Sequence, residues 1–164
     1  MFKLKPISKE SIPVALEKAE RYRLLGEPLL AESICLDILE TDPKNNKAIV
    51  FLILAITDQF NTSSAADTNR AKQLLPRLND EYDRHYYAGI ISERDGKTTL
   101  YKRKSYGSAA YELLIDAMDH YEKAEAIRPS GNDDAILRWN TCARLIMTES
   151  LEPRREQYFE PELE

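Results

Sequence analysis

Two stretches of this chain end at a proline with the same pattern of residues before it, and this pattern constrains the fold more than any other feature. The first is CLDILETDP, which ends at Pro43, and the second is YEKAEAIRP, which ends at Pro129. Proline cannot continue a helix, because it lacks a backbone N–H and its ring clashes with the preceding turn. At twelve, eight and five residues before the two prolines stand Ala31 and Ala117, Cys35 and Tyr121, and Ile38 and Ala124. The matched spacing predicts two copies of one helical unit.

Apolar residues recur at helical spacing along the rest of the chain as well. No segment has the alternation that is typical of a strand, and glycine is scarce at 5 residues. We therefore expect an all-α fold of about seven helices, paired as antiparallel hairpins. The expected helices cover residues 8–25, 28–41, 45–60, a stretch from about Arg70 that is kinked near Pro76, and then 80–94, 108–127 and 132–147.

Capping preferences predict where several of these helices begin. Ser8 or Ser11 is expected to cap the first helix, and Ser108 the one that begins after Gly107. Asn46 and Asn132 each follow a proline by three residues and are candidate caps for the next helix.

The segments between the helices are of two kinds. Residues 61–69 are polar and are expected to form a loop. Residues 97–107 are basic and form either the end of a helix or a loop. By contrast, the segment 45–60 is apolar on nearly all sides, which predicts the most buried helix.

Length and composition fit one globular domain. The chain has 164 residues, of which 43% are apolar and 31% are charged, as in ordinary globular proteins. We expect a single helical domain over residues 1–148 and a charged, partly disordered tail over 149–164.

The proline-ended pattern resembles the tetratricopeptide repeat, a helix–turn–helix unit of about 34 residues. The resemblance is strongest over residues 12–45 and 108–132, and a third first helix is suggested by Gly89 and Gly96, which are spaced like Ala19 and Gly26. In this family small residues lie where two helices cross closely, and a large residue fills the adjacent hole. The resemblance implies a short right-handed α-solenoid of about three degenerate repeats, with the last helix as a cap.

Several classes of protein are disfavoured. The start, MFKLKPISKE, lacks the apolar region of a secretory signal, and the longest apolar run, 48–56, is too short to cross a bilayer. The net charge of −5 disfavours general binding to nucleic acid or to anionic membranes. Cys35 and Cys142 lie far apart in apolar-periodic segments, which predicts buried, reduced thiols in a cytoplasmic protein.

No motif predicts an enzyme or a cofactor. The two histidines, His85 and His120, each follow an acidic residue by one turn, but the sequence does not bring the two pairs together. A structural metal site needs three or four convergent ligands, so we expect no bound metal. Partly exposed histidines on helix surfaces are the simpler interpretation.

The basic segment 97–107 has three interpretations. It contains Lys102, Arg103 and Lys104 between Tyr101 and Tyr106. Basic and aromatic residues together can bind single-stranded nucleic acid. A solvated helix face explains such a run more simply, and docking of an acidic partner segment is at least as reasonable as nucleic-acid binding.

The resemblance to the repeat family implies a binding groove along the first helix of each repeat. This groove is expected to be mixed, with apolar centres and charged edges, as peptide recognition requires. A clamp for a chaperone C-terminus is not expected, because Leu16, Glu20 and Phe51 stand where its Lys and Asn residues would be. The expected groove residues are Leu16, Glu20, Arg23, Val50, Leu54, Asp58, Tyr86, Ile90, Glu93, Arg94, Asn140 and Arg144.

The leading functional hypothesis is therefore a non-catalytic adaptor or scaffold that binds a protein or peptide segment in this groove. The alternative is a structural, self-assembling helical protein that forms homo-oligomers through its terminal helix or through residues 97–107. The sequence does not identify a partner.

Overall fold

The computed structural model describes residues 1–62, 65–102 and 107–155, without the side chains of residues 65 and 66. Within these ranges the chain is all-α, as the sequence predicts, and contains no strand. Short 3-10 turns at Lys9–Ser11 and Leu75–Arg77 accompany the helices. The helices are α1 (Ile12–Leu24), α2 (Pro28–Thr41), α3 (Asn46–Thr57), α4 (Ala65–Leu74), α5 (Glu81–Lys102), α6 (Gly107–Ala126) and α7 (Asp134–Thr148).

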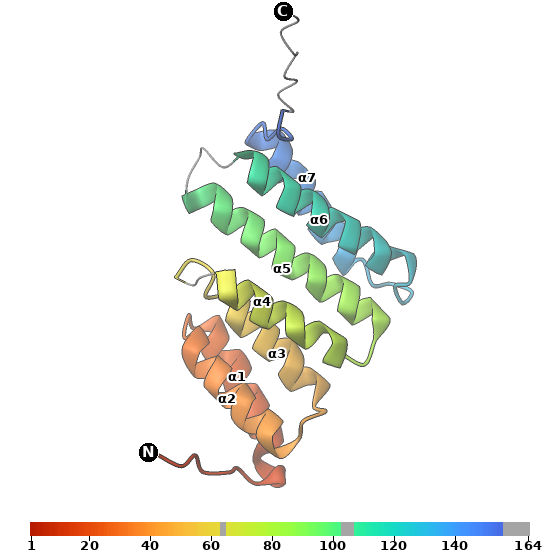
Figure 1. Cartoon of the computed structure of the whole chain (residues 1–164). Coiled ribbons are helices and arrows are strands. Elements are labelled where there is room, and N and C mark those ends of the chain that lie inside the picture. The colour runs from red at the N-terminus through yellow and green to blue at the C-terminus, as the bar shows by residue number, and fades with distance from the viewer. Residues whose placement is uncertain (63–64, 103–106, 156–164) are drawn as a thin grey trace, which may run out of the picture.

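The helices follow one another through the molecule in chain order (Figure 1). Pairs of helices form the hairpins α1–α2, α3–α4 and α5–α6, and α7 packs against α6 at the far end. Helices α1 and α7 stand at opposite ends of the molecule. Most contacts between helices join helices that follow one another in the chain. Helices α3 and α5 connect the first four helices to the last three.

The turn between α1 and α2 agrees with the sequence, but the predicted cap of α1 does not. Pro28 occupies the first turn of α2, where its missing N–H costs nothing. Gly26 lies in the connection with φ +78°, a conformation that glycine adopts easily. Ser11 precedes α1, but its hydroxyl donates to the carbonyl of Ser8 instead of capping the helix.

Three further predictions about helix starts were wrong. Asn45, not Asn46, caps α3 by accepting from the backbone N–H of Ala48. Helix α4 begins at Ala65, inside the expected loop. Helix α6 begins at Gly107, so Ser108 lies within the first turn.

Two other segments are clarified by the structure. Asp133, not Asn132, is the N-cap of α7, although the Asn132 side chain accepts from the N–H of Asp134 in the first turn. Residues 97–102 continue α5 as helix. Arg103, Lys104 and Tyr106 lie outside the described residues.

The core confirms the spacing of the two proline-ended segments. All six aligned side chains are at most 1% exposed: Ala31, Cys35, Ile38, Ala117, Tyr121 and Ala124. They belong to the interiors of two hairpins, α1–α2 and α5–α6. Helix α3 is the most buried described helix, with eight of its 12 residues buried against nine of 22 in α5.

Tyr121 illustrates how a small residue meets a large one at a helix crossing. A Cβ atom added to Gly89 on α5 would lie 2.5 Å from the Tyr121 ring on α6. Only glycine lets the two helices approach this closely around the ring. The crossing therefore places the Tyr121 hydroxyl beside Glu93 of α5.

Candidate binding groove

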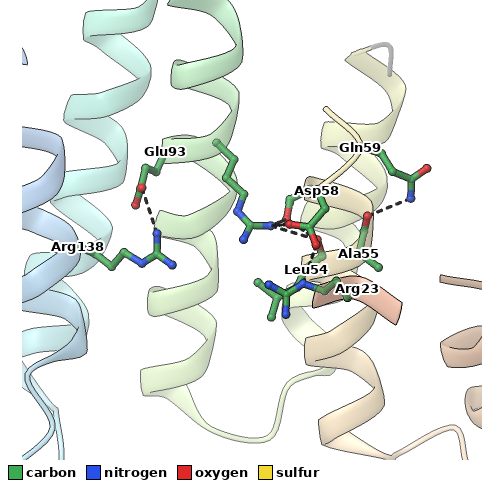
Figure 2. A network of polar contacts seen from close by, with 9 residues as sticks. Arg23, Leu54, Ala55, Asp58, Gln59, Glu93 and Arg138 are labelled. Carbon is green, nitrogen blue, oxygen red and sulfur yellow. Dashed lines mark hydrogen bonds and ion pairs between the residues drawn. The ribbon is translucent and has the colours of Figure 1, made fainter. Parts of the chain in front are cut away.

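Charged side chains from α1, α3 and α5 meet around Asp58 at the end of α3. Arg23 of α1 donates from Nε to Asp58 Oδ2 at 2.6 Å, and Arg94 of α5 donates from Nη1 to Asp58 Oδ1 at 2.5 Å. Figure 2 shows Asp58 beside Arg23. The same Nη1 of Arg94 also contacts Thr57 Oγ1 and the carbonyl of Leu54. The Arg94 side chain therefore hydrogen-bonds both to the Asp58 carboxylate and to the last turn of α3.

A second cluster surrounds Glu93, the residue before Arg94. Its carboxylate is fully buried, and it accepts from the Tyr121 hydroxyl at 2.6 Å, from Lys97 Nζ at 2.5 Å and from Arg138 Nη1 at 3.2 Å. Figure 2 shows Arg138 reaching from α7 toward Glu93. A buried carboxylate is tolerated only when it is paired and hydrogen-bonded, and these three donors meet that need.

The two clusters form one charged row, which we define as Arg23, Asp58, Arg94, Glu93, Lys97 and Arg138. It crosses the odd-numbered helices α1, α3, α5 and α7. Burial lowers the pKa of Arg94, and the neighbouring charges of Arg23 and Arg138 act in the same direction, against Asp58. For Arg138, burial opposes the charged form, but Glu93 together with Tyr86 and Tyr121 outweighs it, so the pKa is raised.

A surface pocket of about 400 Å³ opens beside this row between the end of α3, the second half of α5, and α7. We call it the α5 pocket. Its charged lining consists of Asp58, Glu93, Arg94, Lys97 and Arg138, and its other lining residues are Thr57, Phe60, Asn61, Thr98 and Tyr101.

The predicted groove residues separate into three groups. Arg23, Asp58, Glu93 and Arg94 are brought together in the charged row. Leu16, Val50 and Leu54 are half-buried packing residues of the two hydrophobic clusters, and Tyr86 stacks on Tyr82 with ring centroids 5.7 Å apart. Glu20 and Arg144 are exposed and Asn140 is half-buried, all outside the α5 pocket.

Ile90 differs from its expected position. It is 1% exposed and belongs to the core cluster of α5–α7. A side chain so deeply buried cannot contact a ligand directly. It shares this cluster with Leu114 and Tyr121 of α6 and with Cys142 of α7, so the face of α5 that was expected to be open is closed at this point.

Two residues of the site, Lys97 and Arg138, were not predicted. A signal for Arg138 was present: it falls between Ala135 and Cys142, both fully buried, on the inner stripe of α7. Glu93 likewise lies one turn from Gly89 and from Gly96 on the inner stripe of α5. Opposite charges on two buried stripes indicate a buried ion pair.

The two histidines converge, contrary to expectation. The rings of His85 on α5 and His120 on α6 have centroids 6.3 Å apart. Each Nε2 lies 3.8 Å from a carboxylate one turn away, on Glu81 and Asp116 respectively. Burial lowers the pKa of His120. Across the described residues no group of three or more His, Cys, Asp or Glu side chains could hold a metal ion.

Both cysteines are free thiols in the core, as predicted. Burial raises the pKa of Cys35 to about 12, and that of Cys142 to about 12 as well. A thiol with such a pKa is a poor nucleophile at neutral pH. Cys35 is a packing residue, and it occupies the position in its hairpin that Tyr121 occupies in the other.

A larger hollow of about 610 Å³ lies between α2 and α4. Its floor is apolar, with Leu39, Leu52 and Ile56, and arginines 70 and 77 are among its other lining residues. None of the predicted groove residues lines it.

Comparisons with known proteins supply no relative. No family model, no curated protein and no solved structure matches this chain. None of the helices described is both long and apolar enough to cross a membrane.

Proposed function

We propose that this protein is a non-catalytic adaptor that binds a protein or peptide segment along its odd-numbered helices. The observation that carries the proposal is the α5 pocket, where three helices distant in sequence present charged groups around one hollow. Hot spots of protein interfaces are enriched in arginine and aromatic residues, and Arg94, Arg138 and Tyr101 supply both kinds.

The proposal includes a tetratricopeptide-like right-handed α-solenoid that acts in the cytoplasm. Its support is the pattern of buried small and large residues in the two proline-ended hairpins. In such a stack each hairpin contacts mainly its neighbours, and the first helices of successive hairpins line one side. Arg23, Asp58 and Glu93 come from three of these helices.

The α5 pocket suits recognition better than catalysis. Its carboxylates are both held in ion pairs, and the nearby Cys142 is buried with a raised pKa. A general acid or base must reach the substrate proton, and Glu93 has no exposed surface.

Affinity capture with three forms of the chain tests the proposal. Wild type, a groove variant Arg23→Gln/Arg138→Gln and a control Arg21→Gln/Arg144→Gln are immobilised and exposed to an extract of the native cells. The control also removes one arginine charge from α1 and one from α7, but at exposed positions outside the pocket. Each carboxylate keeps one cation in the groove variant, through Arg94 and Lys97, so folding should survive.

We expect mass spectrometry to identify proteins that wild type and control capture and the groove variant loses. Circular dichroism must first show equal helicity in all three forms. Equal capture by the three folded forms would place the binding surface elsewhere and contradict the proposal.

A further inference from the structure

The α5 pocket has more positive than negative charge, although the chain as a whole carries −5. Three cations, Arg94, Lys97 and Arg138, line it against the two carboxylates of Asp58 and Glu93. Arg23 then adds a fourth cation, since it pairs with Asp58. The pocket is therefore a local positive site on an acidic protein, which attracts anionic groups selectively to this place.

The pocket's arginines keep donors for a ligand. The hydrogen bonds to carboxylates use Nη1 of Arg94, Nη1 of Arg138 and Nε of Arg23, and Arg138 also makes a side-chain hydrogen bond with Tyr86. A guanidinium carries five N–H donors in a planar fork that matches a carboxylate. The side chains of Arg94 and Arg138 are 20% and 36% exposed, so both reach solvent from a partly desolvated position.

Arg94 is incompletely compensated by its surroundings. Burial, with the nearby charges of Arg23 and Arg138, outweighs the attraction of Asp58 and Glu93 and lowers the pKa of Arg94. A further anion beside Arg94 would relieve this imbalance. Partial burial also strengthens such a contact, because water screens it less than on an open surface.

The fixed carboxylates limit the kind of anion. A polyanion such as nucleic acid would meet Asp58 and Glu93 within the same hollow, and the excess of cations is too small to neutralise several phosphates. Single carboxylates match the excess. Tyr101, which is 70% exposed and lines the pocket, provides apolar surface for a neighbouring side chain.

We propose that the α5 pocket binds an acidic segment of a partner protein, with one or two Asp or Glu side chains on Arg94, Lys97 and Arg138 and an adjacent apolar side chain on Tyr101. This inference rests on the proposed function, since it specifies the partner chemistry of that same groove.

Selection from a display library of short random peptides provides the probe. The immobilised full chain is the bait, and the bound sequences are compared with those retained by Arg138→Gln and by Arg144→Gln. Arg144 is an exposed arginine on the same helix and serves as the matched control. We expect wild type and Arg144→Gln to enrich peptides with Asp or Glu beside an apolar residue, and Arg138→Gln to lose them.

Titration of one selected peptide then measures the charge requirement without altering the protein. Replacing its acidic residues by Asn or Gln should weaken binding about tenfold or more, because a charge-assisted hydrogen bond is lost. Lys97→Gln should weaken the parent peptide in the same direction. Binding should also weaken as NaCl rises from about 0.05 M to about 0.5 M.

The possible failures are distinguishable. A library that yields no peptide bound by wild type would contradict the proposed function as well. Selected peptides without acidic residues, or acidic peptides whose amide versions bind equally well, would overturn the acidic specificity and leave peptide binding intact. Tighter, Arg138-dependent binding of a single-stranded oligothymidine would replace the acidic segment by nucleic acid.

Discussion

Glu93 lies in the middle of α5 with no exposed surface, on the inner stripe of small residues, and it belongs to the charged row. Its three donors come from three helices: Lys97 from α5, Tyr121 from α6 and Arg138 from α7. The carboxylate gives each donor an acceptor in a place where water is excluded. The position of Arg138 in the α5 pocket therefore depends on Glu93, and recognition and stability meet at this residue.

Glu93→Gln should lower the free energy of unfolding by about 1–3 kcal/mol, because a neutral amide leaves Lys97 and Arg138 without their carboxylate. Tyr121→Phe removes a single hydrogen bond and should cost about 1 kcal/mol. Urea denaturation followed by circular dichroism measures both. A Glu93→Gln protein as stable as wild type would show that the charge of this carboxylate contributes no net stabilisation.

The sequence predicts which charged residues belong to the site better than it predicts which ion pairs they form. Arg23, Asp58, Glu93 and Arg94 are all in the predicted set, but nothing in the sequence states which carboxylate each arginine meets. Ile90 was misplaced because helical spacing cannot tell which side of α5 its neighbour α6 covers. Arg138 was missed because a single charge on an apolar stripe is informative only once an opposite charge faces it.

The α5–α6 hairpin is the element that fixes the geometry of the site. Gly89 allows α6 to approach α5, and the Tyr121 ring then fills the space so that its hydroxyl reaches Glu93. Substituting glycine by alanine inside a helix normally stabilises it by about 1 kcal/mol. At position 89 close packing opposes this propensity, and the distance decides which effect is larger.

Gly89→Ala should destabilise the protein by about 1–3 kcal/mol, because the new Cβ would lie 2.5 Å from a ring that is fully buried and anchored by its hydroxyl. Gly96→Ala is the matched control on the same helix. Its Cβ would meet Leu113 and Leu114 at 3.2 Å, so its cost should be smaller. Thermal unfolding compares them, and a Gly89→Ala melting temperature at or above that of wild type would contradict the close crossing.

Elements were predicted well where hydrophobic spacing decides and less well where local capping decides. The range of α2 and the burial of α3 follow from apolar periodicity and from proline. The beginnings of α3, α4 and α6 do not follow from these signals. For α3 the reason is that adjacent Asn45 and Asn46 have equal intrinsic capping preference. Tertiary contacts separate them: Asn46 instead accepts from the backbone N–H of Asn79.

The molecule as a whole contains two hydrophobic clusters that meet at α3 and α5. The first cluster is built from α1–α4 and receives Ile91 from α5, while the second is built from α5–α7 and receives Leu54 from α3. The Asp58–Arg94 pair crosses the same boundary. The sequence predicted stacked hairpins but not this exchange of side chains, because its register depends on how α3 and α5 pack.

Ile91 tests how strongly the two halves are coupled. It is fully buried in the first cluster although its helix belongs to the second. Ile91→Ala should cost about 2–5 kcal/mol through lost burial and the resulting cavity. In a stack of repeats, stability is the sum of the stability within each unit and that of the interfaces between units, so this substitution weakens chiefly the interface.

The single tryptophan makes the coupling measurable. Trp139 on α7 packs against the second cluster, so its fluorescence reports that half, while far-ultraviolet circular dichroism reports every helix. In urea the two signals should coincide for wild type and separate for Ile91→Ala. Leu114→Ala leaves a cavity inside the second cluster with the boundary intact, and it should shift both curves together. If the two signals also coincide in Ile91→Ala, the polar contacts across α3 and α5 are sufficient to couple the halves.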